Sequence, residues 1–173
     1  QHCWEVFREG GWFGLSMKPQ YGGQGVPLII AEAVQEFFMS ANFAFGCFAG
    51  MGSGNGSMIE NYGSQALKDL FCARMYDGTW CGSMCLTEPA VGSDAHMVST
   101  KAVPDGPHYR IQGTKIFITS GEHDMAENII HLVIARIEGA PAGAKGVSLF
   151  AVPKIWVNED GSLGQPNDVA CIG

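Results

Sequence analysis

The sequence predicts an α+β protein, in which an N-terminal helical part is followed by a part built from strands. Through residues 1–78, apolar side chains recur at the three- and four-residue spacing of helices that bury one face. Through residues 80–153, short segments rich in Val, Ile, Thr and aromatic residues alternate with turn-forming residues, which is typical of strands. Because helices and strands are segregated along the chain, an antiparallel sheet is favoured over alternating βαβ units. We therefore expect a partial α-helical domain at 1–79 and a partial β-domain at 80–173.

Three helices have recognisable ends. The first occupies the N-terminal residues and stops at the glycine pair that begins with Gly10, after which a turn-rich stretch follows. The second begins after Pro27 and extends over Leu28–Ser40. Because this second segment is apolar nearly all round, we expect it to be buried. The third extends over Gln65–Tyr76, with Ser64 as its N-cap.

Five segments have the composition of strands: residues 80–87, 99–104, 109–120, 128–136 and 147–153. The sequence P-D-G-P at 104–107 predicts a tight turn between the second and third of them. Both ends of the chain fall inside apparent elements, so we expect these residues to be part of a longer protein.

Composition and charge argue against several classes of protein. The formal net charge is −7 and the Lys and Arg residues are scattered, so no nucleic-acid partner is predicted. No apolar run is long enough to cross a membrane, so no transmembrane segment is expected. Cys81 and Cys85 would share one face of a strand, but no second Cys or His pair with zinc spacing accompanies them. We therefore expect reduced, buried thiols, a reducing compartment and no metal site.

Glycines alternate with other residues at 50–56, where the chain reads G-M-G-S-G-N-G. A dinucleotide-binding loop requires the spacing G-x-G-x-x-G between a strand and a helix. The spacing here is different, and an apolar, helix-like stretch precedes the glycines. We interpret them as a place where backbones pack closely, and not as a nucleotide site.

Two segments of the strand-rich part carry residues suited to a flavin. Residues 84–94 (M-C-L-T-E-P-A-V-G-S-D) end a strand and open an irregular loop, in which backbone N–H groups and the hydroxyl of Ser93 can receive an anion. Residues 113–121 (G-T-K-I-F-I-T-S-G) are interpreted as a strand that places Phe117 and Thr119 on one face. An aromatic ring beside a hydroxyl suits one edge of a flavin. Each segment alone also fits an ordinary turn or an amphipathic strand that binds nothing.

Together, the two segments resemble the acyl-CoA dehydrogenase family. Its middle β-domain carries the motifs T-E-P-x-x-G-S-D and G-x-K-x-[WF]-I-T-x-G, which match residues 87–94 and 113–121 in the same order. The sequence Y-G-G-Q-G at 21–25 is similar to the family's P-x-x-Y-G-G-x-G loop. Residues 121–128 (G-E-H-D-M-A-E-N) resemble the subgroup that contains 3-methylmercaptopropionyl-CoA dehydrogenases. The resemblance covers essentially the whole chain and implies a helical segment followed by an antiparallel β-barrel-like domain, both incomplete.

The resemblance implies that the cofactor is FAD and that one wall of its site is built here. Backbone groups of Leu86 and Thr87 would meet the pyrimidine end of the flavin, and Thr119 would lie near its N5 edge. Gly92 would approach the diphosphate, and Ser93 would border both the diphosphate and the acyl-CoA. The complete set of residues implied to bind FAD is Met84, Leu86, Thr87, Gly92, Ser93, Phe117, Ile118 and Thr119.

The implied reaction is the α,β-dehydrogenation of an acyl-CoA thioester, as in the β-oxidation of fatty acids, with hydride transfer to FAD. A carboxylate removes the α-proton. In the family this carboxylate comes from a C-terminal helical domain, so no catalytic base is expected in these residues, and Glu88 is expected only to shape its loop. An acyl-CoA oxidase, a flavin monooxygenase and a non-catalytic homologue that binds flavin or CoA stay open as alternatives.

The resemblance also implies partners and a compartment. The partners are an acyl-CoA substrate and an electron-transfer flavoprotein or a similar electron acceptor. Relatives usually form homodimers or tetramers. The expected compartment is the cytoplasm, or the mitochondrial matrix if the source is eukaryotic.

Overall fold

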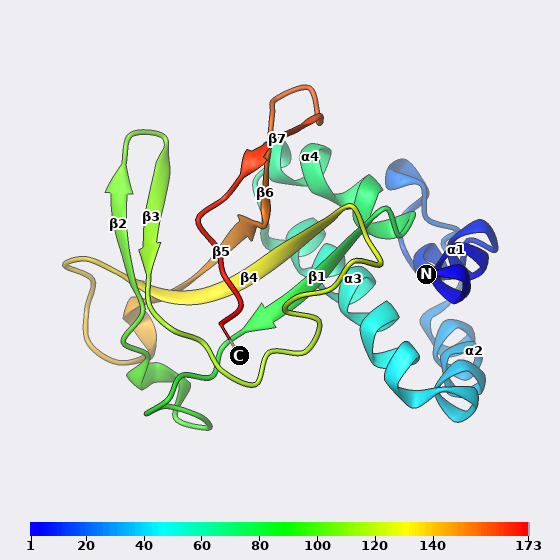
Figure 1. Ribbon diagram of the computed structural model, residues 1–173, viewed down its shortest axis with the longest axis horizontal. Coiled ribbons are helices and arrows are strands. Elements are labelled where there is room, and N and C mark those ends of the chain that lie inside the picture. The colour runs from blue at the N-terminus through cyan, green and yellow to red at the C-terminus, as the bar shows by residue number, and fades with distance from the viewer. Residues whose placement is uncertain (173) are drawn as a thin grey trace. The chain divides into compact units, whose positions relative to one another are not determined.

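The computed structural model describes residues 1–172 and confirms the α+β class (Figure 1). The chain forms two compact units. Unit 1 comprises Gln1–Ser83, Thr119–Ile130 and Pro153–Gly173. Unit 2 comprises Met84–Ile118 and His131–Val152.

The α-helices all belong to unit 1, and the three predicted ones are confirmed. Ser64 caps its helix as predicted, since its hydroxyl accepts a hydrogen bond from Leu67 N–H at 3.3 Å. A further helix contains the glycine-rich stretch, and Asn42 caps it by accepting from Phe45 N–H at 3.0 Å. In chain order the helices are α1 (His2–Glu9), α2 (Leu28–Ala41), α3 (Phe43–Tyr62) and α4 (Gln65–Tyr76). Short 3₁₀ turns, η1 (Trp12–Gly14) and η2 (Pro19–Tyr21), lie between α1 and α2.

The expectation that the second helix is buried is wrong. Only Ala31 of α2 is buried, whereas Ile29 is 75% and Phe37 is 74% exposed. Within unit 1, α2 packs against α3 along one side. The apolar composition of a helix shows which side chains would gain from burial, but it does not show which of them a neighbouring element covers.

Gly52 and Gly56 of α3 confirm the interpretation of close packing, whereas Gly54 between them has no atom within 4 Å of the position of a Cβ. Gly52 lies against the backbone of β1 (Trp80–Cys85), and a Cβ on it would be 3.6 Å from the carbonyl oxygen of Trp80. A Cβ on Gly56 would be 2.7 Å from Cε1 of Tyr76 in α4. That ring cannot easily move aside, because the Tyr76 hydroxyl donates to Glu60 Oε2 at 2.6 Å and the side chain is 2% exposed. Small residues at these positions therefore set how closely α3 approaches α4 and β1.

We expect Gly56→Ala and Gly54→Ala to change stability in opposite directions. The first forces a methyl group into the Tyr76 ring and should destabilise the fold by about 1–3 kcal/mol. The second lies on the same helix with no atom within 4 Å of the new methyl, so the better helix propensity of Ala should stabilise it by about 0.5–1 kcal/mol. Urea denaturation followed by circular dichroism measures both values. Equal effects of the two substitutions would contradict this packing.

An aromatic cluster forms the core of unit 1 and fixes α1. The Nε1–H of Trp4 donates to the carbonyl oxygen of Gly78 at 2.9 Å, which ties α1 to the turn before β1. The ring of Trp4 lies 4.7 Å from that of Phe13 between centroids. The buried members of this cluster are Trp4, Phe7, Phe13, Ala49 and Cys81, with Phe38, Phe45 and Phe48 packed around them.

The main sheet is mixed and has the strand order β1-β4-β2-β3, with β5 also pairing with β4. Strands β2 and β3 form the antiparallel hairpin predicted at the P-D-G-P turn, in register Asp105↔His108. Strands β2 and β4 are parallel, with Lys101 opposite Arg136. The strands besides β1 are β2 (Lys101–Asp105), β3 (His108–Gln112), β4 (Asn128–Ile137) and β5 (Val147–Pro153). A separate antiparallel pair, β6 (Ile155–Val157) and β7 (Leu163–Pro166), belongs to unit 1.

The predicted strand at 109–120 is too long, because β3 ends at Gln112. Beyond it the backbone leaves the extended conformation, with φ of 57° at Phe117 and 59° at Ser120. These values lie in the left-handed region, and strands require a strongly negative φ. The prediction that Phe117 and Thr119 share a strand face is therefore wrong, since no strand is formed at these residues.

The following statements hold for the described residues 1–172. No helix among them is both long and apolar enough to span a membrane. No group of three or more His, Cys, Asp and Glu side chains among them is arranged to hold a metal ion. All six cysteines are free thiols, but the expectation that they are buried holds only for Cys72, Cys81 and Cys85, since Cys3 and Cys171 are exposed.

Candidate functional site

The carboxylate of Glu88 organises the loop that follows β1. Its side chain is buried in unit 2, and its oxygens are surrounded by donors. Oε2 accepts from the N–H of Ser99 at 2.8 Å and from its hydroxyl at 2.6 Å. Oε1 accepts from the N–H of Thr100 at 3.0 Å, from its hydroxyl at 2.6 Å and from the ammonium of Lys115 at 2.8 Å. These bonds hold Glu88 in place from two other segments of the unit.

These partners also decide the charge of Glu88. Burial alone would raise its pKa, but the hydrogen bonds from Lys115, Ser99 and Thr100 outweigh burial and hold the pKa well below its usual range. Glu88 is therefore ionised at neutral pH, and its lone pairs are already engaged by donors. Such a carboxylate is unsuited to take a proton from a substrate, in agreement with the expectation that Glu88 shapes its loop.

Lys115 joins the two segments that the sequence singled out. Its side chain is 10% exposed, and its Nζ donates to Glu88 Oε1 and to the carbonyl oxygen of Leu86 at 3.0 Å. The next residue, Ile116, donates its N–H to the carbonyl oxygen of Thr87 at 2.9 Å. The backbone at 86–88 is thus fixed by consecutive residues of the second segment.

The same bonds leave the donors of Thr87 available. Within residues 1–172, its carbonyl is occupied by Ile116, whereas neither its N–H nor its hydroxyl has a hydrogen-bond partner. Thr87 is half-buried, as are the neighbouring Leu86 and Met84. An N–H and a hydroxyl on one residue, in a partly apolar setting, suit the carbonyl or ring nitrogen of a planar heteroaromatic group.

The loop after Glu88 reverses direction and then becomes exposed. Glu88 and Val91 exchange two backbone hydrogen bonds, of 2.8 and 3.1 Å, which close the turn. Gly92 and Ser93 follow on the surface. No heavy atom lies within 4 Å of the position that a Cβ on Gly92 would take. A bulky anionic group can therefore approach this part of the backbone without a steric clash.

Phe117 is held in an unusual state. Its side chain is 90% exposed, and its positive φ is strained for an aromatic residue. An exposed aromatic ring on strained backbone gains nothing for the fold of unit 2 by itself, and strain of this kind is concentrated at binding and catalytic sites. Ile118 beside it is half-buried.

The predicted flavin residues are divided between the two units. Thr119 is exposed and belongs to unit 1. The others belong to unit 2: Met84, Leu86, Thr87, Gly92, Ser93, Phe117 and Ile118. The structure brings the segments around Thr87 and Ile116 together. The two segments are far apart in the sequence, which does not by itself indicate that they are in contact.

Sequence reasoning missed three residues that shape the site, namely Lys115, Ser99 and Thr100. The sequence did contain a signal for Lys115. This lysine stands among apolar residues, and a lysine is buried only when it has a partner such as a carboxylate. No local pattern identified Ser99 and Thr100 as the residues that bind Glu88. Their role depends on where β2 begins relative to the loop.

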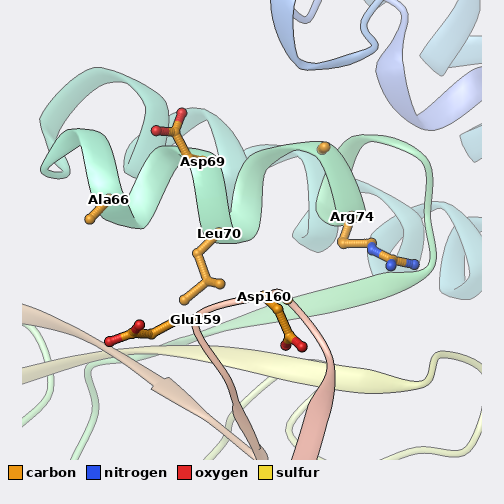
Figure 2. Close-up of a pocket in the computed structure, with 8 residues that line it drawn as sticks. Ala66, Asp69, Leu70, Arg74, Glu159 and Asp160 are labelled. Carbon is orange, nitrogen blue, oxygen red and sulfur yellow. The ribbon is translucent and has the colours of Figure 1, made fainter.

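A pocket of about 520 Å³ lies in unit 1, between α4 and the turn at 159–161 (Figure 2). Leu70 points into it from α4, opposite Glu159 and Asp160. Two of its carboxylates have local partners, since Asp69 accepts from Gln65 and Asp160 accepts from Ser162. None of the predicted site residues lines this pocket.

Comparison with known proteins identifies the class of protein. Residues 1–79 match the N-terminal domain of acyl-CoA dehydrogenases, and residues 83–166 match their middle domain. The chain therefore belongs to the acyl-CoA dehydrogenase family.

Particular relatives include a 3-methylmercaptopropionyl-CoA dehydrogenase of Ruegeria pomeroyi, which is 42% identical over 171 residues. That match covers 98% of this chain and 29% of the relative, so the chain spans less than a third of that protein. Among solved structures, an acyl-CoA dehydrogenase of Bacillus anthracis complexed with FAD has a TM-score of 0.74 and 28% identity, covering 87% of this chain and 25% of that one. A structure described as an electron transferring flavoprotein of Acidaminococcus fermentans has a TM-score of 0.78 and 28% identity, covering 87% of this chain and 39% of that one.

Proposed function

We propose that this chain forms part of the FAD site of an enzyme that catalyses the α,β-dehydrogenation of an acyl-CoA thioester. The observation that carries the proposal is the junction of the two segments in unit 2. Lys115 and Ile116 fix the carbonyls of Leu86 and Thr87, and the N–H and hydroxyl of Thr87 stay available as donors. Residues 1–79 would belong to an N-terminal helical domain and residues 80–173 to a middle β-domain, in line with the family matches.

The chemistry of these groups fits the cofactor that we propose. Bound FAD supplies the hydride acceptor. Thr87 would donate hydrogen bonds to the pyrimidine end, and the ring of Phe117 would pack against the isoalloxazine. Met84, Leu86 and Ile118 would add apolar contacts or backbone groups, and Thr119 would be a further hydroxyl donor. Gly92 and Ser93 would receive the diphosphate, with Ser93 also bordering the acyl-CoA.

The proton chemistry would need a carboxylate from outside these residues. Glu88 is engaged by Lys115, Ser99 and Thr100, and Glu122 is paired with Lys154. We propose that the base comes from the helical C-terminal domain that the family supplies. The role of the present residues would be to orient the flavin and the thioester. In that orientation the α-proton would be placed for removal by the base and the β-hydrogen for transfer to the flavin as hydride.

We further propose an electron-transfer flavoprotein or a similar acceptor as the partner, and a homodimer or tetramer as the assembly. The likeness to the Acidaminococcus fermentans structure supports the first of these. The free thiols support a reducing compartment, the cytoplasm or the mitochondrial matrix, and the family supports a place in β-oxidation.

The test uses the full-length protein that contains this chain. We expect it to bind FAD and to oxidise acyl-CoA with an artificial electron acceptor. Thr87→Val should raise the Kd for FAD about tenfold, since it removes the hydroxyl that we place on the flavin. Phe117→Ala should weaken binding by a similar factor. Thr114→Val, an exposed threonine of the same segment, is the matched control and should bind FAD like the wild type.

Three results would contradict or refine the proposal. A wild-type protein without FAD and without acyl-CoA oxidation would refute it. Unchanged FAD affinity in Thr87→Val and Phe117→Ala would refute the placement of the flavin. Rapid reoxidation of the reduced flavin in air, measured by stopped flow, would identify an oxidase or a monooxygenase instead of a dehydrogenase.

A further inference from the structure

The side chain of Arg136 connects two loops of unit 2. Arg136 lies on β4, and its Nη2 donates to the carbonyl oxygen of His96 at 2.7 Å. Its Nη1 donates to the carbonyl oxygen of Pro141 at 2.6 Å. Both nitrogens donate to the carbonyl oxygen of Gly143, at 3.1 and 3.2 Å. One planar guanidinium therefore binds the backbone at three positions.

These positions belong to two different loops. His96 follows Ser93 by three residues, in the short helix η3 (Ala95–Met97). Pro141 and Gly143 belong to the turn between β4 and β5. Because every contact is to a main-chain oxygen, Arg136 acts on the course of the backbone and not on the identity of particular side chains.

The space between the two loops that Arg136 joins is partly open. A pocket of about 320 Å³ lies between them, lined by His96, Met97, Arg136, Ala140 and Ala142. Side-chain packing therefore does not fill the space that Arg136 spans. Within residues 1–172 no carboxylate lies within 4.0 Å of the guanidinium, so carbonyl dipoles are its partners in this unit.

We infer that Arg136 is a positioning residue for the proposed FAD and acyl-CoA site, an inference that rests on the proposed function. By holding the carbonyl of His96, it fixes the end of the exposed segment 92–97, which begins with Gly92 and Ser93. A fixed segment presents its N–H groups and the Ser93 hydroxyl to the diphosphate without first having to be ordered. Lysine cannot replace arginine here, because one ammonium lacks the fork that reaches carbonyls of two loops.

The experiment compares Arg136→Lys and Arg136→Gln with Arg110→Lys in the full-length protein. Arg110 is the matched control, since it belongs to the same unit and its ion pair with Asp105 is exposed. Four quantities are measured: the Kd of the apoprotein for FAD by flavin fluorescence, the rate of amide hydrogen exchange at 93–97, and KM and kcat for acyl-CoA. For Arg136→Lys we expect the Kd for FAD to rise about tenfold. Exchange at 93–97 should quicken by a similar factor, and KM should rise more than kcat falls.

Each outcome decides between the inference and a simpler role. If Arg136→Lys matches the wild type in FAD affinity and in exchange at 93–97, the inference is overturned while the proposed function stands. Faster exchange throughout unit 2, with no excess at 93–97, shows general destabilisation and also overturns it. If the wild type binds no FAD, the proposed function fails, and the inference fails with it. Should Arg136→Gln not fold, Arg136→Lys, which keeps the charge and the aliphatic stem, carries the test.

Discussion

Glu88→Gln is expected to lower the free energy of unfolding by about 3–5 kcal/mol, because it breaks a buried ion pair and leaves the Lys115 ammonium without its counter-charge. The substitution keeps the size of the side chain but turns an NH₂ group toward donors on Ser99, Thr100 or Lys115. Urea denaturation followed by circular dichroism measures the change.

Two further variants distinguish the loss of this buried ion pair from the loss of a charge in general. Asp105→Asn removes the exposed partner of Arg110 and should cost less than about 1 kcal/mol. Adding Lys115→Met to Glu88→Gln should cost less than the sum of the two single changes, because the unpaired ammonium is then absent. A loss of under 1 kcal/mol in Glu88→Gln would show that the ion pair does not hold the loop.

The low pKa of Glu88 adds a dependence on pH with a definite sign. A carboxyl whose pKa is lower in the folded than in the unfolded protein contributes stability above its ordinary pKa, about 4.3 for Glu. That contribution is lost as the pH falls below this value. The difference in stability between the wild type and Glu88→Gln should therefore be constant near neutrality and shrink in acid. A difference that grows on acidification would contradict the assigned charge.

Trp4→Ala should destabilise unit 1 by about 3–5 kcal/mol. The ring is 2% exposed and packs on Phe13, and its removal leaves a cavity in the aromatic cluster. It also leaves the carbonyl of Gly78 without the indole N–H. Trp4→Phe keeps an aromatic ring but loses the N–H and part of the ring volume, and should cost less than Trp4→Ala, about 1–3 kcal/mol. Both values come from urea denaturation.

Trp12→Ala is the matched control, since Trp12 is 39% exposed and packs on Phe38 at the edge of the same cluster. We expect it to cost about 1 kcal/mol. Equal losses for Trp4 and Trp12 would mean that the cluster around Trp4 is not the core of unit 1.

Trp4 and Glu88 stabilise different parts of the molecule. Trp4 fixes α1 to the turn before β1, and so supports the helical part of the fold. Glu88 and Lys115 fix the backbone from which the donors of Thr87 project. Loss of Trp4 is expected to impair the proposed function by destabilising unit 1. Loss of Glu88 or Lys115 is expected to impair it by changing the geometry of the candidate site.

Local features of the sequence were sufficient for much of the secondary structure. Ser64 caps α4 because its hydroxyl lies three residues before an unsatisfied N–H, and this depends on neighbouring residues alone. The hairpin of β2 and β3 follows from the P-D-G-P turn for the same reason. The motifs at 87–94 and 113–121 likewise identified the family, since residue types in a fixed order are a property of the chain.

What the sequence left undecided depends on groups that are distant along the chain. The exposure of α2 depends on how much of its surface a neighbouring helix covers, and the composition of α2 does not indicate this. The strand expected at 109–120 ends at Gln112, and the segment beyond it bonds instead to a distant part of the chain, as Ile116 N–H does to the carbonyl oxygen of Thr87. The partners of Glu88 come from residues 11 to 27 positions away, and only folding brings them to one carboxylate. The sequence by itself determined the family and the local elements, whereas the tertiary structure decided burial and the shape of the site, because both depend on long-range contacts.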